Sequence, residues 1–330
     1  MFDRSTAEKV AFLSCPDSYP GVTKVDVKQT HMSWVFLTDS HAWKMKKPVR
    51  NDYMDFSTTE ARRSNCEQEV TLNRRLAPDV YLGLVPLAVD NAGFNLAGEG
   101  EIVDWLVQMR RVPADRMLDR AIAERTWKEE DLRKIGILLS DFYADMPPAE
   151  ITSVEYRQSL AEELKNARSE LNRCEYRLPG NLVDSLVSSG LDLIEKQPAL
   201  FDRRITAGRI VEGHGDLRPE HICLEPTPVI IDCLEFNRSL RILDVASELM
   251  FLRLECERLG AAEVGQRILE TYCVRSGDQP SKPILSFYRS QHACVRAKLA
   301  VWHLRDDSSG QRYQWVDRAK GYLELAASEL

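Results

Sequence analysis

Residues 213–232 read GHGDLRPEHICLEPTPVIID, and this stretch decides the fold expected for the chain. The β-branched run Val229-Ile230-Ile231 is typical of a short buried strand, and it ends at Asp232. Glu225-Pro226-Thr227-Pro228 predicts the turn of a hairpin before that strand. Asp216 and Asp232 therefore stand at the two ends of one hairpin unit, from which both carboxylates can project into one cleft. Phosphoryl transfer from ATP requires such a pair of carboxylates, because one acid takes a proton from a hydroxyl and the other holds a divalent cation.

The motif HGDLRPEH, residues 214–221, resembles the catalytic loop of the protein-kinase-like superfamily. Its His-Gly-Asp form is similar to that of the aminoglycoside phosphotransferases and choline-type kinases. The protein-kinase pattern H-R-D-L-x-x-x-N aligns with it without a gap, so that Asp216 matches the catalytic aspartate and His221 stands where asparagine is expected. Asp232 falls at the position of the metal-binding aspartate of Asp-Phe-Gly, although this chain continues as Asp-Cys-Leu-Glu. The resemblance implies an α+β, bilobal protein-kinase-like fold with a small β-rich N-terminal lobe and a larger α-helical C-terminal lobe.

The resemblance also implies roles for the residues of this loop. Asp216 would accept or orient the proton of the attacking hydroxyl, since an ordinary aspartate pKa of ~3.9 leaves it ionised at neutral pH. Asp232 would bind Mg²⁺ that bridges the ATP phosphates. Arg218 would stabilise charge on the transferring phosphoryl group, or would instead pair with Glu220 or Glu235.

His221 departs from the family pattern, because an imidazole is a poorer magnesium ligand than the amide oxygen of asparagine. Three interpretations remain open. His221 ligates the metal (Mg²⁺ or Mn²⁺) through nitrogen, or Glu235 takes over this function, or the activity is weakened.

The N-terminal part of the chain predicts a β-meander with strands over Val22–Lys28, Trp34–Leu37 and His41–Lys47. In a kinase-like lobe, the loop Thr30–Ser33 would take the place of the glycine-rich loop over the phosphates. It contains no glycine. Ser33 is therefore the candidate phosphate contact, through its hydroxyl or its backbone N–H.

Lys44 and Lys46 lie on one face of the third strand, because side chains alternate along it. One of them would anchor the α- and β-phosphates of ATP, and Lys44 is preferred because it lies further inside the strand. A helix expected over Thr58–Leu76 would supply the glutamate that holds this lysine. Glu69 is preferred to Glu67, since leucines follow it at i+3 and i+7 on the face that should turn inward.

Two further strands are expected over Tyr81–Val89 and Glu101–Arg111, joined by a turn at Asn91–Gly100. The second of these strands would lead into the hinge of a kinase-like fold. Gln108 and Met109 are the candidates for contact with adenine.

Helices dominate the rest of the chain. Capping-box patterns at Ser57, Thr126 and Thr152 predict where three helices begin. Another helix is expected from Arg241, in which the resemblance gives Asp244 a structural role behind the catalytic loop. The chain is therefore divided into a nucleotide-binding lobe, residues 1–107, and a helical lobe, residues 108–330, with the catalytic loop and the acceptor site.

Composition sets the wider limits. A net charge of −7 argues against broad nucleic-acid binding, and the eight cysteines form no C-x-x-C pair. The start of the chain lacks the features of a signal peptide, and no apolar run approaches the ~18 residues of a membrane span. We therefore expect a cytoplasmic protein without a membrane partner. The sequence contains no G-x-x-x-x-G-K-[ST], so a P-loop ATPase domain, to which related chains can be joined, is absent from it.

The leading interpretation is an ATP-dependent phosphotransferase that acts on an alcohol group of a small molecule. An aminoglycoside is one specific acceptor, for which Glu248, Glu255 and Glu257 would supply an acidic pocket. A second interpretation makes the acceptor a protein or an RNA. A third is a nucleotide-binding pseudokinase that serves a regulatory function.

Overall fold

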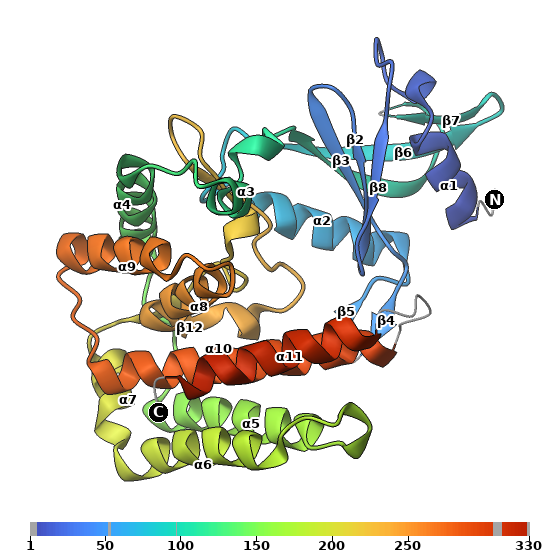
Figure 1. Ribbon diagram of the computed structural model, residues 1–330. Coiled ribbons are helices and arrows are strands. Elements are labelled where there is room, and N and C mark those ends of the chain that lie inside the picture. Colours follow the sequence, from blue (N-terminus) through green and yellow to red (C-terminus); the bar gives the residue numbers. More distant parts are fainter. Residues whose placement is uncertain (1–4, 52–53, 97, 306–311, 329–330) are drawn as a thin grey trace. The chain divides into compact units, whose positions relative to one another are not determined.

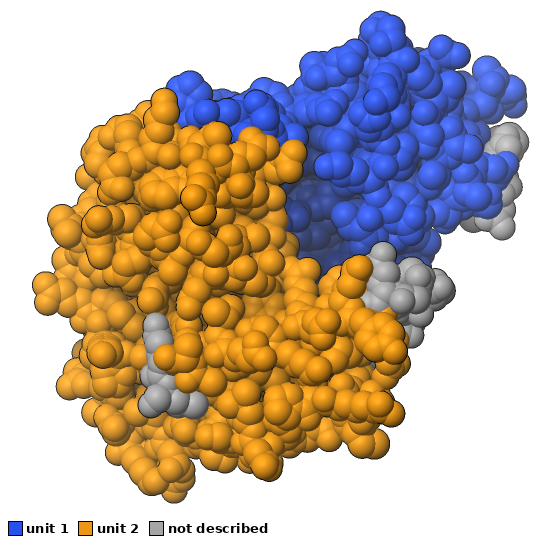
Figure 2. Space-filling model, in the orientation of Figure 1, with its two compact units in different colours: residues 1–117, 221–240 blue, residues 118–220, 241–330 orange. Residues whose placement is uncertain are grey.

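The computed structural model describes residues 5–51, 54–96, 98–305 and 312–328. The chain divides into two compact units, which Figure 2 shows in blue and orange. Unit 1 comprises Met1–Met117 and His221–Leu240, and unit 2 comprises Leu118–Glu220 and Arg241–Leu330. The boundary expected after residue 107 lies within a strand of unit 1, and the functions assigned to residues 1–107 and 108–330 stay predictions.

Unit 1 is built on a six-stranded antiparallel sheet in the order β1-β2-β3-β8-β6-β7 (Figure 1). Its strands are β1 (Asp26–Gln29), β2 (Ser33–Leu37), β3 (His41–Lys46), β6 (Tyr81–Asp90), β7 (Gly93–Leu96) and β8 (Glu101–Arg110). The short pair β4 (Arg50–Asn51) and β5 (Met54–Asp55) lies between β3 and the helix α2 (Thr59–Asn73) along the chain. The three strands of the predicted meander are confirmed, with the first beginning at Asp26.

A buried carboxylate fixes two helices of unit 1 to the sheet. Asp104 on β8 accepts hydrogen bonds from Arg62 of α2, with Nε at 2.8 Å and Nη2 at 3.0 Å. Lys9, from the N-terminal helix α1 (Thr6–Leu13), donates to the same carboxylate at 2.9 Å and to the Val103 carbonyl at 2.7 Å. Since the side chains of Asp104 and Arg62 are each only 5% exposed, this ion pair replaces the water that both charges would otherwise require.

The predicted hairpin is present as β10 (Ile222–Cys223) and β11 (Val229–Ile230), which pair antiparallel within unit 1. Arg110, at the end of β8, makes a two-pronged ion pair with Glu225 in the hairpin turn, at 2.7 and 2.8 Å. Cys223 and Val229 belong to a buried apolar cluster together with Ala42, Val107 and Met109. The hairpin therefore packs on residues from the middle strands of the sheet.

Unit 2 is almost entirely helical. Its helices are α3 (Leu118–Glu124), α4 (Glu129–Asp145), α5 (Ser153–Leu171), α6 (Gly180–Lys196), α7 (Pro198–Thr206), α8 (Val245–Arg258), α9 (Ala262–Ser276), α10 (Lys282–Trp302) and α11 (Arg312–Ala327). The long helices α5, α6, α10 and α11 pack side by side, and α8 packs against both α9 and α10 (Figure 1). A small ladder of β9 (Ile210–Glu212) and β12 (Ile242–Asp244) lies on either side of the catalytic-loop sequence along the chain.

The structure corrects several expected elements. The turn expected at Asn91–Gly100 contains the strand β7, because Phe94 and Leu96 pack against the apolar cluster around Leu87. The helices α3 and α7 were not expected, and α7 begins at Pro198, where a fixed φ suits the first helical position. The helix expected from Arg241 starts at Val245, because the preceding residues pair with β9.

Two of the three expected helix caps are also corrected. Thr58, not Ser57, caps α2 by accepting from the Ala61 N–H. At α4, Asp131 accepts from the Lys128 N–H, so the cap lies beyond Thr126. The Thr152 box is confirmed at α5.

No helix within the described residues combines the length and apolarity that a membrane crossing requires. The expected cytoplasmic location stays a prediction. The first four residues, on which the expectation about a signal peptide partly rests, lie outside the described residues.

Replacement of Thr152 by alanine is expected to lower the free energy of unfolding by about 1 kcal/mol, because its hydroxyl accepts from the Glu155 N–H at the start of α5. Urea denaturation measures this change. Thr126→Ala is the matched control and should change stability by no more than a few tenths of that value, since Thr126 is exposed and caps no helix. Equal losses in the two variants would contradict the assigned caps.

Candidate active site

Lys44 lies between two carboxylates within unit 1. Its Nζ atom is 2.8 Å from Glu69 Oε1 on α2 and 2.7 Å from Asp232 Oδ1, just after β11. β3 carries Lys44 into this position because it lies between β2 and β8 in the sheet. The structure therefore brings together three of the residues singled out from the sequence, and it places Glu67 elsewhere, in an exposed pair with Arg63.

Lys46 occupies the next position on the same strand face and is more deeply buried. Its side chain is 1% exposed, against 13% for Lys44, and its ammonium contacts both Glu69 and Glu235. Glu69, with no exposed side-chain surface, is thus shared by both lysines. Of the two lysines, Lys44 keeps more contact with solvent and contacts Asp232. Its role as the lysine that anchors ATP stays a prediction.

Charge balance within this cluster sets the ionisation of its members. Burial alone would raise the pKa of Glu69, but the ammonium groups of Lys44 and Lys46 lower it below its ordinary value. Burial likewise acts to raise the pKa of Asp232, and Lys44 and His221 outweigh it, so that this pKa is lowered. Burial acts to lower the pKa of Lys44, but the facing carboxylates, Asp232 first, raise it well above its ordinary range. Glu69, Asp232 and Lys44 therefore carry their charges at neutral pH.

Two residues that the sequence did not suggest position Asp232. Asp232 has a left-handed backbone with φ of 62°, which aspartate tolerates better than most residues. The Tyr81 hydroxyl accepts from the Asp232 N–H at 3.0 Å, and Asn73 Oδ1 accepts from the Cys233 N–H at 2.8 Å. Asn73 lies four residues after Glu69 on α2, so one face of that helix holds both the lysines and the turn that carries Asp232. The spacing of four residues between Glu69 and Asn73 was the sequence signal that could have identified Asn73.

His221 lies beside Asp232, as the metal hypothesis requires. Its Nε2 atom is 3.5 Å from Asp232 Oδ2, and its side chain is 8% exposed, against 47% for that of Asp232. The described residues contain no group of three or more histidine, cysteine or acidic side chains that would hold a metal ion by themselves. Glu235, the proposed substitute for His221, is bound to Lys46. The metal-binding roles assigned to His221 and Asp232, and the alternative with Glu235, stay predictions.

A buried glutamate in unit 2 holds the backbone of the catalytic-loop sequence. Glu248 on α8 accepts from the N–H groups of His214, at 3.0 Å, and Gly215, at 2.5 Å. Its Oε2 atom also accepts from the Tyr143 hydroxyl at 2.6 Å. A Cβ atom at Gly213 would lie only 2.5 Å from Oε2, so a larger residue at this position would displace the Glu248 carboxylate. Sequence reasoning missed this function of Glu248.

Asp216 and Arg218 lie next to each other in unit 2. Arg218 Nη2 is 3.0 Å from Asp216 Oδ2, and the two side chains are 21% and 28% exposed. Glu220, one of the alternative partners, is instead 3.3 Å from Arg258. The catalytic roles assigned to Asp216 and Arg218 stay predictions.

Asp244 caps α8 and anchors its start within unit 2. Its carboxylate accepts from the Ala246 N–H, from Arg204 at 2.7 and 2.8 Å, and from the Tyr288 hydroxyl at 2.9 Å. This is a structural role, as expected. Asp244 also affects the loop at residues 213–216, because it fixes the start of α8 and Glu248, which binds this loop, lies one turn further along the helix.

The remaining candidates lie within the sheet. Ser33 begins β2 and is 1% exposed, and its N–H donates to Thr30 Oγ1. Gln108 and Met109 lie inside β8, where β3 and β6 pair with them on both sides. The contacts predicted for Ser33 with phosphate, and for Gln108 and Met109 with adenine, stay predictions.

The acidic pocket considered for an aminoglycoside is not formed by the three glutamates named for it. Glu248 holds the catalytic loop, and Glu255, with no exposed side-chain surface, contacts Arg258 and Arg296 at 2.9 Å each. Glu257 pairs with Arg289 at 2.8 Å. Glu255 and Glu257 are thus paired with arginines, and Glu248 is occupied by hydrogen bonds to the loop and to Tyr143.

Comparisons with solved structures establish the fold class. The structure resembles aminoglycoside 2'-phosphotransferase-IIIa, solved in complex with GDP, with a TM-score of 0.62 and 12% identity over 99% of this chain and 100% of that chain. A choline/ethanolamine kinase family protein from Mesorhizobium loti matches with a TM-score of 0.54 and 14% identity, over 97% of this chain and 94% of that chain. Spectinomycin phosphotransferase, solved in complex with AMP, matches with a TM-score of 0.55 and 14% identity, over 94% of each chain. The chain therefore shares its fold with these aminoglycoside phosphotransferases and choline/ethanolamine kinase family proteins, and the predicted α+β, protein-kinase-like fold class is confirmed.

Among curated proteins, the chain is 35% identical over 285 residues to Uncharacterized protein Rv2004c of Mycobacterium tuberculosis (strain ATCC 25618 / H37Rv). Uncharacterized protein Mb2027c of Mycobacterium bovis matches to the same extent. The match covers 83% of this chain and 54% of each relative, so the chain spans about half the length of these curated relatives. No protein-family profile matches the chain.

Lys46→Met is expected to lower the free energy of unfolding by about 3 kcal/mol, because it leaves Glu235 buried without its ammonium partner. The double variant Lys46→Met, Glu235→Gln should recover part of this loss. Chemical denaturation of the wild type, both single variants and the double variant forms the thermodynamic cycle. Lys28→Met, on the exposed edge strand β1, is the control and should be near neutral. Effects that add to within about 0.5 kcal/mol would refute the coupling.

Proposed function

We propose that this chain is an ATP-dependent phosphotransferase that transfers the γ-phosphoryl group to a hydroxyl of a small molecule. The observation that carries the proposal is Lys44, held between Glu69 and Asp232 at 2.8 and 2.7 Å. In phosphoryl transfer on a kinase-like fold, a strand lysine paired with a helix glutamate contacts the nucleotide phosphates, and a nearby aspartate holds the metal. The nucleotide-bound phosphotransferases of the same fold support this reading.

An apolar surface of unit 1 fits the base of the nucleotide. Ala42 on β3 and Met109 on β8 belong to the buried cluster that includes Cys223 and Val229 of the hairpin. Val35 and Ile231 pack against it and are only partly buried. A flat aromatic ring that inserts beside these side chains would complete their burial, which favours binding of a purine in front of Lys44.

The donor set beside Lys44 fits Mg²⁺ or Mn²⁺ when ATP phosphates supply the remaining ligands. Magnesium is commonly held by one or two protein ligands together with substrate phosphates, which agrees with the absence of a larger ligand cluster in the described part of the chain. Asp232 Oδ2 and His221 Nε2, which are 3.5 Å apart, would hold the ion. Such an ion would neutralise charge on the phosphates.

Asp216 would orient the acceptor hydroxyl and take its proton. Its carboxylate lies beside the Arg218 guanidinium and is partly exposed, so an acceptor hydroxyl could come within hydrogen-bond reach of it. Glu248 fixes the backbone on the N-terminal side of Asp216, so this carboxylate is presented by a rigid loop. Arg218, 3.0 Å away, would then stabilise charge on the phosphoryl group as it transfers.

A screen of a metabolite pool with labelled ATP tests the proposed function. Transfer of label to a small hydroxyl compound is expected with the wild type and not with Asp216→Ala, which serves as the blank. GTP in a parallel arm tests the choice of nucleotide, since one structural neighbour was solved with GDP. Tight nucleotide binding without transfer to any acceptor would favour the pseudokinase, and label in protein or RNA would favour a macromolecular acceptor.

His221→Asn is expected to raise turnover with Mg²⁺ relative to Mn²⁺, because an amide oxygen is the harder ligand and imidazole suits Mn²⁺ better. Steady-state rates of the wild type and the variant with each metal measure this ratio. The same Mn²⁺ to Mg²⁺ ratio in both proteins would remove His221 from the metal site. Glu235→Gln is the companion variant, and a change in the ratio there would assign the second ligand to Glu235 instead.

A further inference from the structure

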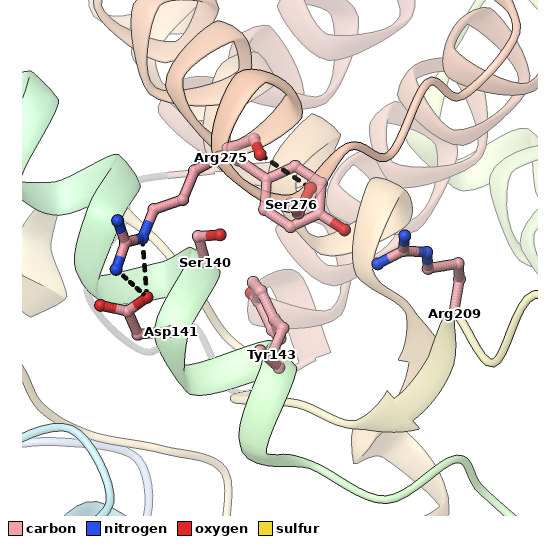
Figure 3. A pocket seen from close by; sticks show the side chains of 8 residues that line it. Ser140, Asp141, Tyr143, Arg209, Arg275 and Ser276 are labelled. Carbon is pink, nitrogen blue, oxygen red and sulfur yellow. Dashed lines mark hydrogen bonds and ion pairs between the residues drawn. The ribbon is translucent and has the colours of Figure 1, made fainter.

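Unit 2 contains a pocket that takes no part in the proposed phosphotransfer. The pocket has a volume of about 350 Å³, which is in the range of small-molecule sites (Figure 3). It is lined by residues of α4 and α9 and by Arg209, the residue before β9. The lining residues are Ser140, Asp141, Tyr143, Ala144, Arg209, Tyr272, Arg275 and Ser276.

The charge of the lining favours an anion. Arg209 and Arg275 lie on opposite sides of the pocket, and Asp141 is the single acid that lines it (Figure 3). Asp141 binds Arg275, with Nη2 at 2.6 Å. Two cations and one anion leave a positive pocket in a chain whose net charge is −7.

Arg209 is the less compensated of the two arginines. Its ion-pair contact among the described residues is a long one, 3.8 Å from Nε to Asp278 Oδ2. Asp278 is itself bound to Arg204, through Nη2 at 2.7 Å, and to the Tyr272 hydroxyl at 2.9 Å. Arg204 also binds Asp244, so its single charge is shared between two acids. Arg209 contacts Asp278 only at 3.8 Å, and its guanidinium, which is about a third exposed, lines the pocket.

The remaining wall of the pocket suits a small polar molecule. The Ser140 hydroxyl points into the pocket (Figure 3), and Ser276 lies at its rim near Arg275. The rings of Tyr143 and Tyr272 meet edge to face, with centroids 6.0 Å apart, and form a rigid apolar part of the lining. A carboxylate or phosphate group on a compact body would meet both kinds of surface.

The pocket also contacts the machinery that holds the catalytic-loop sequence. Tyr143, which lines it, donates to Glu248 Oε2 at 2.6 Å. The same carboxylate accepts from the backbone N–H groups of His214 and Gly215. A ligand that moves Tyr143 therefore changes the hydrogen bonding of the loop through one intermediate side chain.

We propose that this pocket binds a small molecule with one carboxylate or phosphate group, that Arg209 anchors this group, and that occupancy is transmitted to residues 213–216 through Tyr143 and Glu248. Binding and its effect on the loop are measurable without any phosphotransfer. By reciprocity, whatever changes the loop through Glu248 also changes the affinity of the pocket.

Calorimetric titration with inorganic phosphate and, separately, with acetate tests the binding and distinguishes the two chemistries. Arg209→Gln is expected to weaken binding by about tenfold or more, because it removes a charge-assisted contact. Arg267→Gln is the matched control, since Arg267 lies on the same helix as Arg275 but does not line the pocket, and binding there should be unchanged. Arg209→Lys keeps the charge and should retain part of the affinity, which separates loss of the anchor from loss of the fold.

Phosphate bound at the proposed nucleotide site is excluded by repeating the titration in Lys44→Met. Binding that persists in Lys44→Met and weakens in Arg209→Gln supports the pocket. Binding that is lost in Lys44→Met and unchanged in Arg209→Gln assigns the phosphate to the nucleotide site and overturns the proposal. The absence of binding by either probe to the wild type also overturns it, and neither result bears on phosphotransfer.

Hydrogen exchange tests the connection to the loop. Saturation with the probe is expected to change exchange at the amides of His214 and Gly215 in the wild type. Tyr143→Phe removes only the hydroxyl that donates to Glu248, so this variant should bind the probe without the change in exchange. An identical change in Tyr143→Phe, or no change in the wild type, would overturn the proposed transmission.

Discussion

A single buried carboxylate governs the arrangement of unit 1. Glu69 has no exposed side-chain surface and carries a charge, so it requires compensation within the protein. It receives this from two lysines of β3, which fixes α2 against the sheet at one register. The other contacts of the same lysines reach Asp232 and Glu235, so the segment after the hairpin is held by the same charges. Displacing any one of these elements would strand a buried charge.

Unit 2 uses a buried carboxylate for a related purpose. Glu248 accepts two successive backbone N–H groups of the loop and a tyrosine hydroxyl, so three donors surround its charge. The loop is therefore held by its backbone, and the Asp216 side chain, which is partly exposed, contacts Arg218. In both units a carboxylate that is withdrawn from solvent positions a segment that presents a more exposed one. This separates the charge that maintains the structure from the charge that is available for chemistry.

The sequence was informative where function and local pattern coincide. The hairpin was predicted from its turn residues and its β-branched run, which act within a few residues. The roles of Lys44 and Glu69 were implied by the resemblance to the kinase-like family, and local pattern only selected them over Lys46 and Glu67. Lys46 with Glu235, and Glu248 with residues 214 and 215, were not predicted as pairs, because they join positions far apart in the chain. A local pattern marks Glu248 only as a helix acid, and its partners become evident when α8 is placed next to the loop. The strand β12 was missed for a similar reason, since three residues form a strand only when β9 lies beside them.

Lys46 affects how Lys44 would bind the phosphates of a nucleotide in the proposed function. Lys44 is paired with Asp232 at 2.7 Å, and phosphates that approach it compete for the same ammonium. If Glu69 depended on Lys44 alone, any movement of that lysine would leave a buried carboxylate without its cation. Lys46 remains in contact with Glu69 throughout, and Glu235 balances the charge of Lys46 in turn. In the proposed phosphotransferase, Lys44 would therefore exchange Asp232 for a phosphate while the buried charges stay paired, and Asp232, next to His221, would become available to a cation.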